Sequence, residues 1–251
     1  MLRGLDISAS GMIAEMARVD VISNNMANVA TPGFKRAGTN QGVFYLELVR
    51  ARSQQEGGAV RPDSPHRIGA RTQLAGTWVV QEQGALRFTD NSLHAAINGP
   101  GYFVAATPSG ERYTRDGRFH VDQDGWLVTA QGHRVLGEQG PIRLSGTDAA
   151  IGAAGAVTSN GELIGVLRIV DFAQPGALQR VGDNLFAVGA AGEPQAVAAV
   201  LSPRHIEESN VNAVAEMVEL IAATRRYEAN QKVIQAHDDT LSKAVNEVGR
   251  V

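Results

Sequence analysis

The N-terminal segment repeats apolar side chains at helical spacing. Successive positions are separated mostly by four and three residues in alternation, so they follow one stripe along a helix. We call this stripe the N-terminal seam: Leu5, Ala9, Met12, Met16, Val19 and Met26. The charged residues Asp6, Glu15 and Arg18 fall off the stripe. The pattern therefore predicts a helix that packs against another helix.

A second stripe with the same seven-residue repeat runs through the C-terminal part of the chain. We call it the C-terminal seam: Ala213, Met217, Leu220, Tyr227, Ile234 and Leu241. Thr224, Gln231 and Asp238 also fall on this stripe, so it is less purely apolar. The pattern predicts a helix from about 212 to 247, roughly 50 Å long at ~1.5 Å per residue.

The residues between the two predicted helices show the pattern expected of β-strands separated by turns. Residues 113–121 alternate in polarity, and Asp122–Gly125 form a turn that leads to a second strand, as in a hairpin. Residues 50–66 are polar and contain two prolines, which favours an extended linker.

We therefore expect a mixed α and β fold. Residues 1–35 and 205–251 would form a coiled-coil-like module of paired terminal helices, residues 36–68 an extended linker region, and residues 69–204 a central all-β domain.

A polar junction motif follows the N-terminal helix: Asn24, Asn25, Asn28, Thr31, Pro32, Gly33 and Phe34. The residue before a proline avoids the α region, so the helix should end near Asn28. Asparagine amides can bond to backbone groups at a helix end and turn, which favours a fixed junction with the β domain. The alternative is that these amides only solvate a helix face.

The composition and the motifs argue against an enzyme active site, a metal site or a cofactor site. The net charge of −3 gives no attraction to nucleic acid, and the absence of cysteine excludes disulfides, thiolate nucleophiles and cysteine-bound zinc. The six histidines lack metal-ligand spacing, and neither a nucleophile elbow nor a phosphate-binding loop occurs. We expect no catalytic, metal or cofactor site, no small-molecule substrate, and a protein that is not an enzyme.

Two interpretations of the seams remain open on this basis. The helices could pack on the β domain as ordinary core, or they could pair with each other and with neighbouring chains. A membrane-surface anchor is disfavoured, because Asp6, Glu15 and Asp20 offset Arg3 and Arg18 on the N-terminal helix.

Three blocks of the sequence resemble bacterial flagellar rod and hook proteins. They comprise residues 20–35 (DVISNNMANVATPGFK), residues 89–129, and the motifs ESNVN, EMV, RYE and KVI between 208 and 234. A departure is His94, where the family often has aspartate. The length resembles that of rod members rather than hook members. Residues 135–142 and 212–218 are most similar to proximal-rod members, with a distal-rod or hook-type member as the alternative.

The resemblance implies a structural subunit of the flagellar basal body that polymerises through its terminal helices into a torque-transmitting axial tube. Its partners would be other axial proteins, copies of itself and the flagellar type III export apparatus. The location would be the rod within the cell envelope and periplasm, reached without a cleaved signal peptide. The N-terminus fits that route, since charged residues interrupt any apolar stretch.

Overall fold

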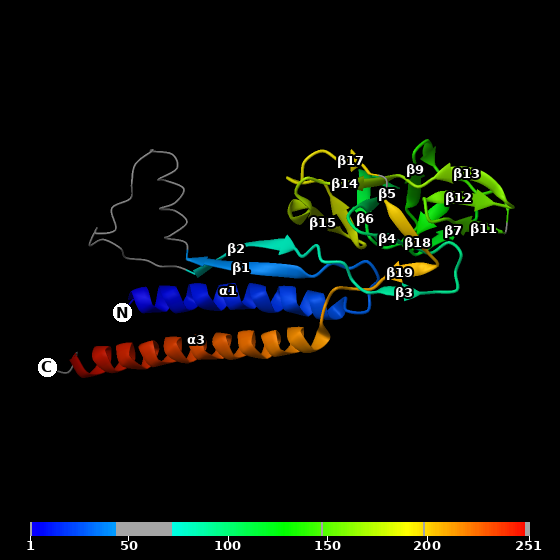
Figure 1. Ribbon diagram of the computed structural model, residues 1–251. Coiled ribbons are helices and arrows are strands. Elements are labelled where there is room, and N and C mark those ends of the chain that lie inside the picture. Colours follow the sequence, from blue (N-terminus) through cyan, green and yellow to red (C-terminus); the bar gives the residue numbers. More distant parts are fainter. Residues whose placement is uncertain (1, 44–71, 147, 198, 249–251) are drawn as a thin grey trace. The chain divides into compact units, whose positions relative to one another are not determined.

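The computed structural model describes residues 2–43, 72–146, 148–197 and 199–248. The chain divides into two compact units (Figure 1). The helical unit comprises Met1–Met26, Ala37–Thr77 and Ala213–Val251, and the β unit comprises Ala27–Arg36 and Trp78–Asn212.

The helical unit contains two long helices and a two-stranded sheet. Helix α1 spans Leu2–Ala27 and helix α3 spans Ala213–Val248, close to the ends expected from the seams. Strand β1 (Ala37–Val43) pairs with strand β2 (Thr72–Val79). Among the described residues, no helix is both long and apolar enough to cross a membrane.

The β unit is built around a ten-stranded sheet. The path of this sheet is β15 (Gln179–Gly182), β16 (Leu185–Ala187), β6 (Gly110–Thr114), β5 (Tyr102–Thr107), β9 (Arg134–Gly137), β8 (Leu127–Thr129) and β7 (Phe119–Val121). Strand β10 (Gly140–Pro141) pairs with β9, while β14 (Ile169–Asp171) pairs with both β5 and β17 (Gln195–Ala196). A single 3₁₀ turn, η1, spans Pro175–Ala177.

Three smaller sheets complete the unit. One contains β11 (Ala149–Ile151), β12 (Ala156–Ser159) and β13 (Glu162–Val166). The other two pair β18 (Val200–Pro203) with β4 (Ala95–Asn98), and β19 (His205–Glu207) with β3 (Leu86–Phe88). The expected mixed fold, with terminal helices and a central β domain, is confirmed.

Local sequence explains the predicted hairpin. Strands β7 and β8 are antiparallel, with Val121 opposite Leu127. Between them, one carboxylate oxygen of Asp122 accepts hydrogen bonds from the amides of Asp124 and Trp126, at 3.0 and 2.7 Å. This is the local bonding that favours aspartate in turns.

Two clusters of buried apolar side chains form the core of the β unit. Phe103 and Phe119 meet edge to face in one cluster, with ring centroids 5.0 Å apart. In the other, Phe172 packs edge to face against Tyr102 and Tyr113. Both clusters lie within residues 78–212, so the β unit has its own core.

The unit boundaries differ from the division expected from the sequence. Residues 27–36 and 205–212 group with the β unit, whereas strand β1 and most of β2 group with the helices. Strand β1 starts inside the expected linker, 36–68, and the part of that linker after residue 43 lies outside the described residues.

Candidate assembly surface and junction

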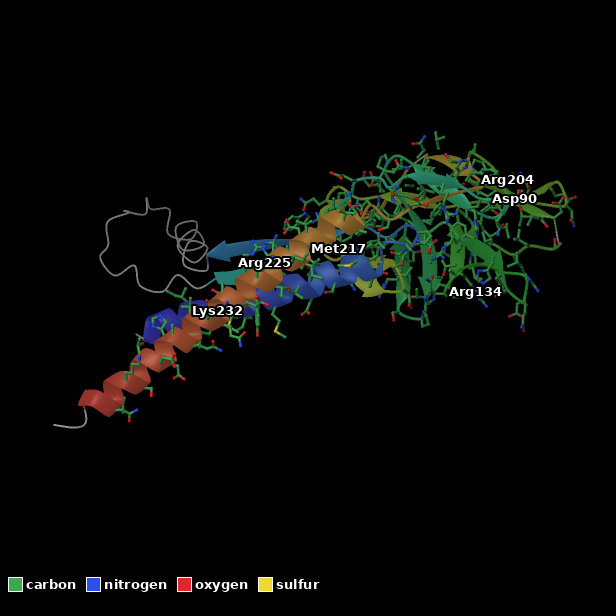
Figure 2. All side chains as sticks on the ribbon, turned by 90° about the horizontal axis from the view of Figure 1, so that it is seen from below. Asp90, Arg134, Arg204, Met217, Arg225 and Lys232 are labelled. Atoms are coloured by element: carbon green, nitrogen blue, oxygen red, sulfur yellow. The ribbon has the colours of Figure 1, made fainter. Side chains whose placement is uncertain are left out.

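Helices α1 and α3 run side by side in opposite directions (Figures 1 and 2). Three polar contacts join them. The Arg18 guanidinium lies 2.5 Å from the Glu219 carboxylate, and Arg226 lies 3.5 Å from Glu15. The Asn25 amide donates to Glu216 at 3.2 Å. We call these six residues the polar ladder.

The two helices also approach each other closely at Gly11, and buried apolar side chains occur on both helices. A Cβ atom added to Gly11 would lie 3.0 Å from the Asn230 amide nitrogen, so the backbone of α1 approaches α3 closely there. Ile22 and Ala223 are buried at 5% and 0% exposure. The polar pairs thus occur together with a close approach of the two helices and with buried apolar side chains.

The seams flank this contact line. On both helices the contact residues come one position before a seam residue, as Glu15 precedes Met16 and Glu216 precedes Met217. Met16 and Met217 remain 59% and 53% exposed, and Ala9 is also exposed. The other seam residues are half-buried: Leu5, Met12, Val19, Met26, Ala213, Leu220, Tyr227, Ile234 and Leu241.

More apolar side chains are exposed elsewhere on the helices. On α1 they are Ile7 and Ile13, and on α3 they are Val214, Val218, Ile221, Val233 and Val245. Within the described residues, the helical unit thus leaves much apolar surface uncovered, which is typical of an interaction site.

The junction motif is divided between the two units. Asn25, 1% exposed, both donates to the carbonyl of Ala37 and accepts from its amide, each at 2.9 Å. Its side chain thus mimics a paired strand and holds the start of β1 inside the helical unit. Asn24 is exposed and Asn28 is half-buried.

The remainder of the motif forms a turn in the β unit. The Thr31 amide and hydroxyl bond to the Asn28 carbonyl and side-chain oxygen, and the Phe34 amide donates to the Thr31 carbonyl. Pro32, Gly33 and Phe34 are buried, and the Asn184 amide donates to the Pro32 carbonyl at 2.8 Å. Asparagine amides therefore bond to backbone groups at both ends of this segment.

Gly33 occupies a position that only glycine fits. Its φ angle is +70°, in the left-handed region, and an added Cβ would lie 2.4 Å from the Asp116 amide nitrogen. The Gly33 amide donates to the Glu207 carbonyl at 2.7 Å. The turn is thereby fixed against strand β19.

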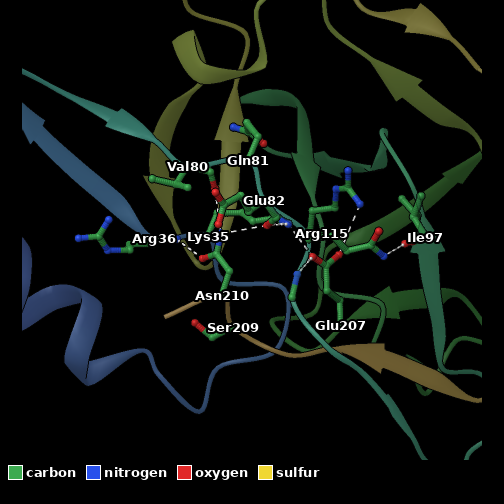
Figure 3. Close-up of polar contacts among 12 residues, drawn as sticks. Lys35, Arg36, Val80, Gln81, Glu82, Ile97, Arg115, Glu207, Ser209 and Asn210 are labelled. Carbon is green, nitrogen blue, oxygen red and sulfur yellow. Dashed lines mark hydrogen bonds and ion pairs between the residues drawn. The ribbon is translucent and has the colours of Figure 1, made fainter. Parts of the chain in front are cut away.

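A buried ionic cluster lies next to this turn (Figure 3). Lys35 Nζ is 2.5 Å from Glu207 Oε1 and donates to the Glu82 carbonyl at 2.7 Å. Arg115 lies 3.4 Å from the second Glu207 oxygen, and the Gly84 amide donates to the first at 2.9 Å. Burial lowers the pKa of Lys35, while the Glu207 charge opposes that shift.

Asn210 extends this network. Its amide donates to the carbonyls of Val80 and Glu82, and its side-chain oxygen accepts from the Arg36 amide at 2.6 Å. Sequence reasoning missed both Asn210 and the ionic cluster. One signal was available, because lysine occurs only at 35, 232 and 243 in a chain whose basic residues are otherwise arginine.

In the described residues, no group of three or more histidine or acidic side chains is placed to hold a metal ion. What the structure does bring together is a helix pair with exposed apolar side chains and, in the β unit, a hydrogen-bonded turn that follows α1 in the chain.

Three family models match the chain in sequence order. "Flagella basal body rod protein" matches residues 5–35, "Flagellar hook protein FlgE/F/G D1 domain" residues 96–159, and "Flagellar basal body rod FlgEFG protein C-terminal" residues 202–247. A flagellar basal-body rod protein FlgG of Caulobacter vibrioides is 36% identical over 96% of this chain and 97% of its own. The chain belongs to the flagellar basal-body rod and hook family, FlgE/F/G.

Other relatives agree with membership in this family. The FlgG of Borreliella burgdorferi is 35% identical over 98% of each chain, and the FlgF of Rhizobium meliloti is 30% identical over 99% of each chain. The matched blocks of the FlgE/F/G family correspond to α1 with the junction, the centre of the β unit, and β19 with α3.

Proposed function

We propose that this protein is a non-enzymatic structural subunit of the bacterial flagellar rod that polymerises through its terminal helices. The observation that carries the proposal is the position of the seams. Residues of the polar ladder form contacts between α1 and α3. The apolar seam residues Met16 and Met217 stay more than half exposed.

Burial of this surface would drive assembly. Removing a leucine or methionine side chain from water contributes about 1.5–3 kcal/mol. Association itself costs roughly 4–15 kcal/mol, so each contact would have to bury many such side chains. A tube that grows at its end needs a heterologous contact, in which one surface meets a different surface of the next subunit. The partners would be copies of this chain and other axial proteins.

The position along the rod is a finer question. The segments 135–142 and 212–218 suggested the proximal-rod member FlgF, whereas the identity to FlgG relatives exceeds that to the FlgF relative, 36% against 30%. We propose a rod subunit of the FlgF/FlgG type, located in the cell envelope and exported by the flagellar type III apparatus without a cleaved signal. Proximal and distal placement are separated by the experiment below.

Basal bodies from a strain lacking the gene would be imaged by electron microscopy. A rod truncated near its base indicates a proximal subunit, and a rod truncated before its distal part indicates a distal one. A complete rod would contradict the proposal.

Complementation then tests the seam. Leu220→Asp places a charge on the C-terminal seam, so the β unit should fold but motility should be lost. Ala229→Asp adds the same group at an exposed position outside both seam and ladder, and should restore swimming. Normal swimming with Leu220→Asp would refute the role of the seam.

A further inference from the structure

Two pairs of the polar ladder share one antiparallel register with the close approach of Gly11 to Asn230. From Asn25 back to Gly11 on α1 is two heptads, and from Glu216 forward to Asn230 on α3 is the same number of residues. The pair Glu15–Arg226 falls on the same register between them. The contacts therefore follow one line from Gly11 to Asn25 on α1 and from Glu216 to Asn230 on α3. Arg18 reaches Glu219, one helical turn from that register.

The seams are displaced from this line in the same sense on both helices. One residue along an α-helix is a rotation of about 100°. Seam residues come one position after contact residues on α1 and on α3 alike. Because the helices are antiparallel, equal rotations in chain direction bring the two seams to the same side of the pair. Leu5, Met12 and Val19 thus share one apolar face with Leu220, Tyr227 and Ile234.

A competing arrangement is available to the same two helices. If each turned by one residue, the two seams would face each other and form an ordinary coiled-coil core. Hydrophobic burial favours that arrangement in an isolated chain. It would break the pairs Arg18–Glu219 and Glu15–Arg226 and would hide the apolar face.

We propose that the polar ladder holds the helix pair in the rotation that keeps both seams outside the pair, on one common side. Buried or half-buried polar pairs fix register in coiled coils at a cost in stability. Here they would prevent the subunit from burying its own seams. The use of this face rests on the proposed rod function: it would take an apolar helix of a neighbouring subunit.

Disulfide trapping tests the rotation directly, because the natural chain has no cysteine. Gly11→Cys with Asn230→Cys reports the ladder arrangement, and Met12→Cys with Gln231→Cys reports the seam-to-seam arrangement. In the purified full-length monomer we expect the first pair to crosslink at least tenfold faster. Equal rates, or a faster second pair, would overturn the proposal, as would the absence of crosslinking in both.

Charge reversal then tests the cause. Arg18→Glu should slow the first crosslink several-fold and favour the second, and adding Glu219→Arg should restore the original preference. Arg225→Glu, an exposed arginine of α3 outside the ladder, is the control and should change neither rate. If Arg18→Glu leaves the preference unchanged, the ladder does not set the rotation. Both crosslinking rates are measured on the monomer. The proposal about the ladder can therefore be refuted while the rod assignment holds, and the rod assignment can be refuted while the proposal about the ladder holds.

Discussion

Lys35 and Glu207 form an ion pair of 2.5 Å in which both side chains are only 1% exposed. Lys35 lies in the segment after α1, and Glu207 ends the strand that leads toward α3. The pair therefore joins, inside the β unit, the two stretches of chain that continue into the terminal helices. Its position suggests that it fixes the points from which the helices leave.

Replacing Lys35 by methionine should destabilise the β unit. The substitution keeps the volume but leaves Glu207 buried with Arg115, at 3.4 Å, as its one remaining cation in the described structure. Removing one partner of a buried ion pair costs about 3–5 kcal/mol, and Arg115 should hold the loss near ~3 kcal/mol. Urea unfolding measures this.

A neighbouring pair provides the control for that measurement. Glu208 pairs with Arg87 at 2.9 Å, but both side chains are about half exposed. Exposed ion pairs contribute ~0–1 kcal/mol, so Glu208→Gln should have a small effect. Equal losses in the two variants would show that the buried cluster has no special role.

Replacing Gly33 by alanine should disrupt the junction turn. The new Cβ would meet the backbone of Asp116 at 2.4 Å and would force alanine into the left-handed region. Backbone strain and overpacking together should cost about 3 kcal/mol in thermal or urea unfolding. Gly132→Ala, with φ +86° and nothing within 4 Å of its added Cβ, should cost only ~1 kcal/mol. Similar losses would argue that strain alone, and not the close approach, is responsible.

Asn25→Ala tests the amide that connects α1 to β1. The change removes both bonds to Ala37, each worth ~1 kcal/mol, and leaves the half-buried amide and carbonyl of Ala37 to find other partners. Hydrogen exchange at the Ala37 amide should then accelerate by about thirtyfold. Asn24→Ala, at an exposed position, should leave that rate within about twofold. No acceleration in Asn25→Ala would mean that the strand is held by other contacts.

The sequence predicted the elements better than their contacts. The end of α1 near Asn28 and the hairpin at Asp122–Gly125 follow from local rules on proline and turn residues. Seven-residue periodicity identified apolar stripes, but it could not say which face of α1 meets α3. That choice depends on pairs such as Arg18 and Glu219, which are 201 residues apart, so no local pattern contains it.

The contacts of the junction also could not be predicted from local sequence patterns. Asparagine, proline and glycine indicated a turn, yet its fixation depends on Glu207, 172 residues after Lys35. Burial of a lysine is rare and is tolerated only with a partner, so a lone lysine could suggest a special role but not name that partner.

Tyr102 should make the β unit sensitive to alkaline pH. Burial, opposed by Arg115, raises the pKa of the Tyr102 phenol to about 12, and its hydroxyl donates to Gln81. The unfolded chain loses this proton near pH 10, whereas the folded protein keeps it. Between these values the folded state binds more protons, so stability falls as pH rises, by about 2–3 kcal/mol in total at pH 12.

Tyr102→Phe isolates this contribution. At neutral pH the variant should be ~1 kcal/mol less stable, because it lacks the hydrogen bond to Gln81. Above about pH 11 the difference should vanish and then reverse, since phenylalanine has no proton to lose in the unfolded chain. Tyr113, whose pKa is also raised by burial, is present in both proteins and cancels in the comparison. Urea unfolding from pH 7 to 12 measures both curves, and parallel curves would show that Tyr102 ionises as easily in the folded protein as in the unfolded chain.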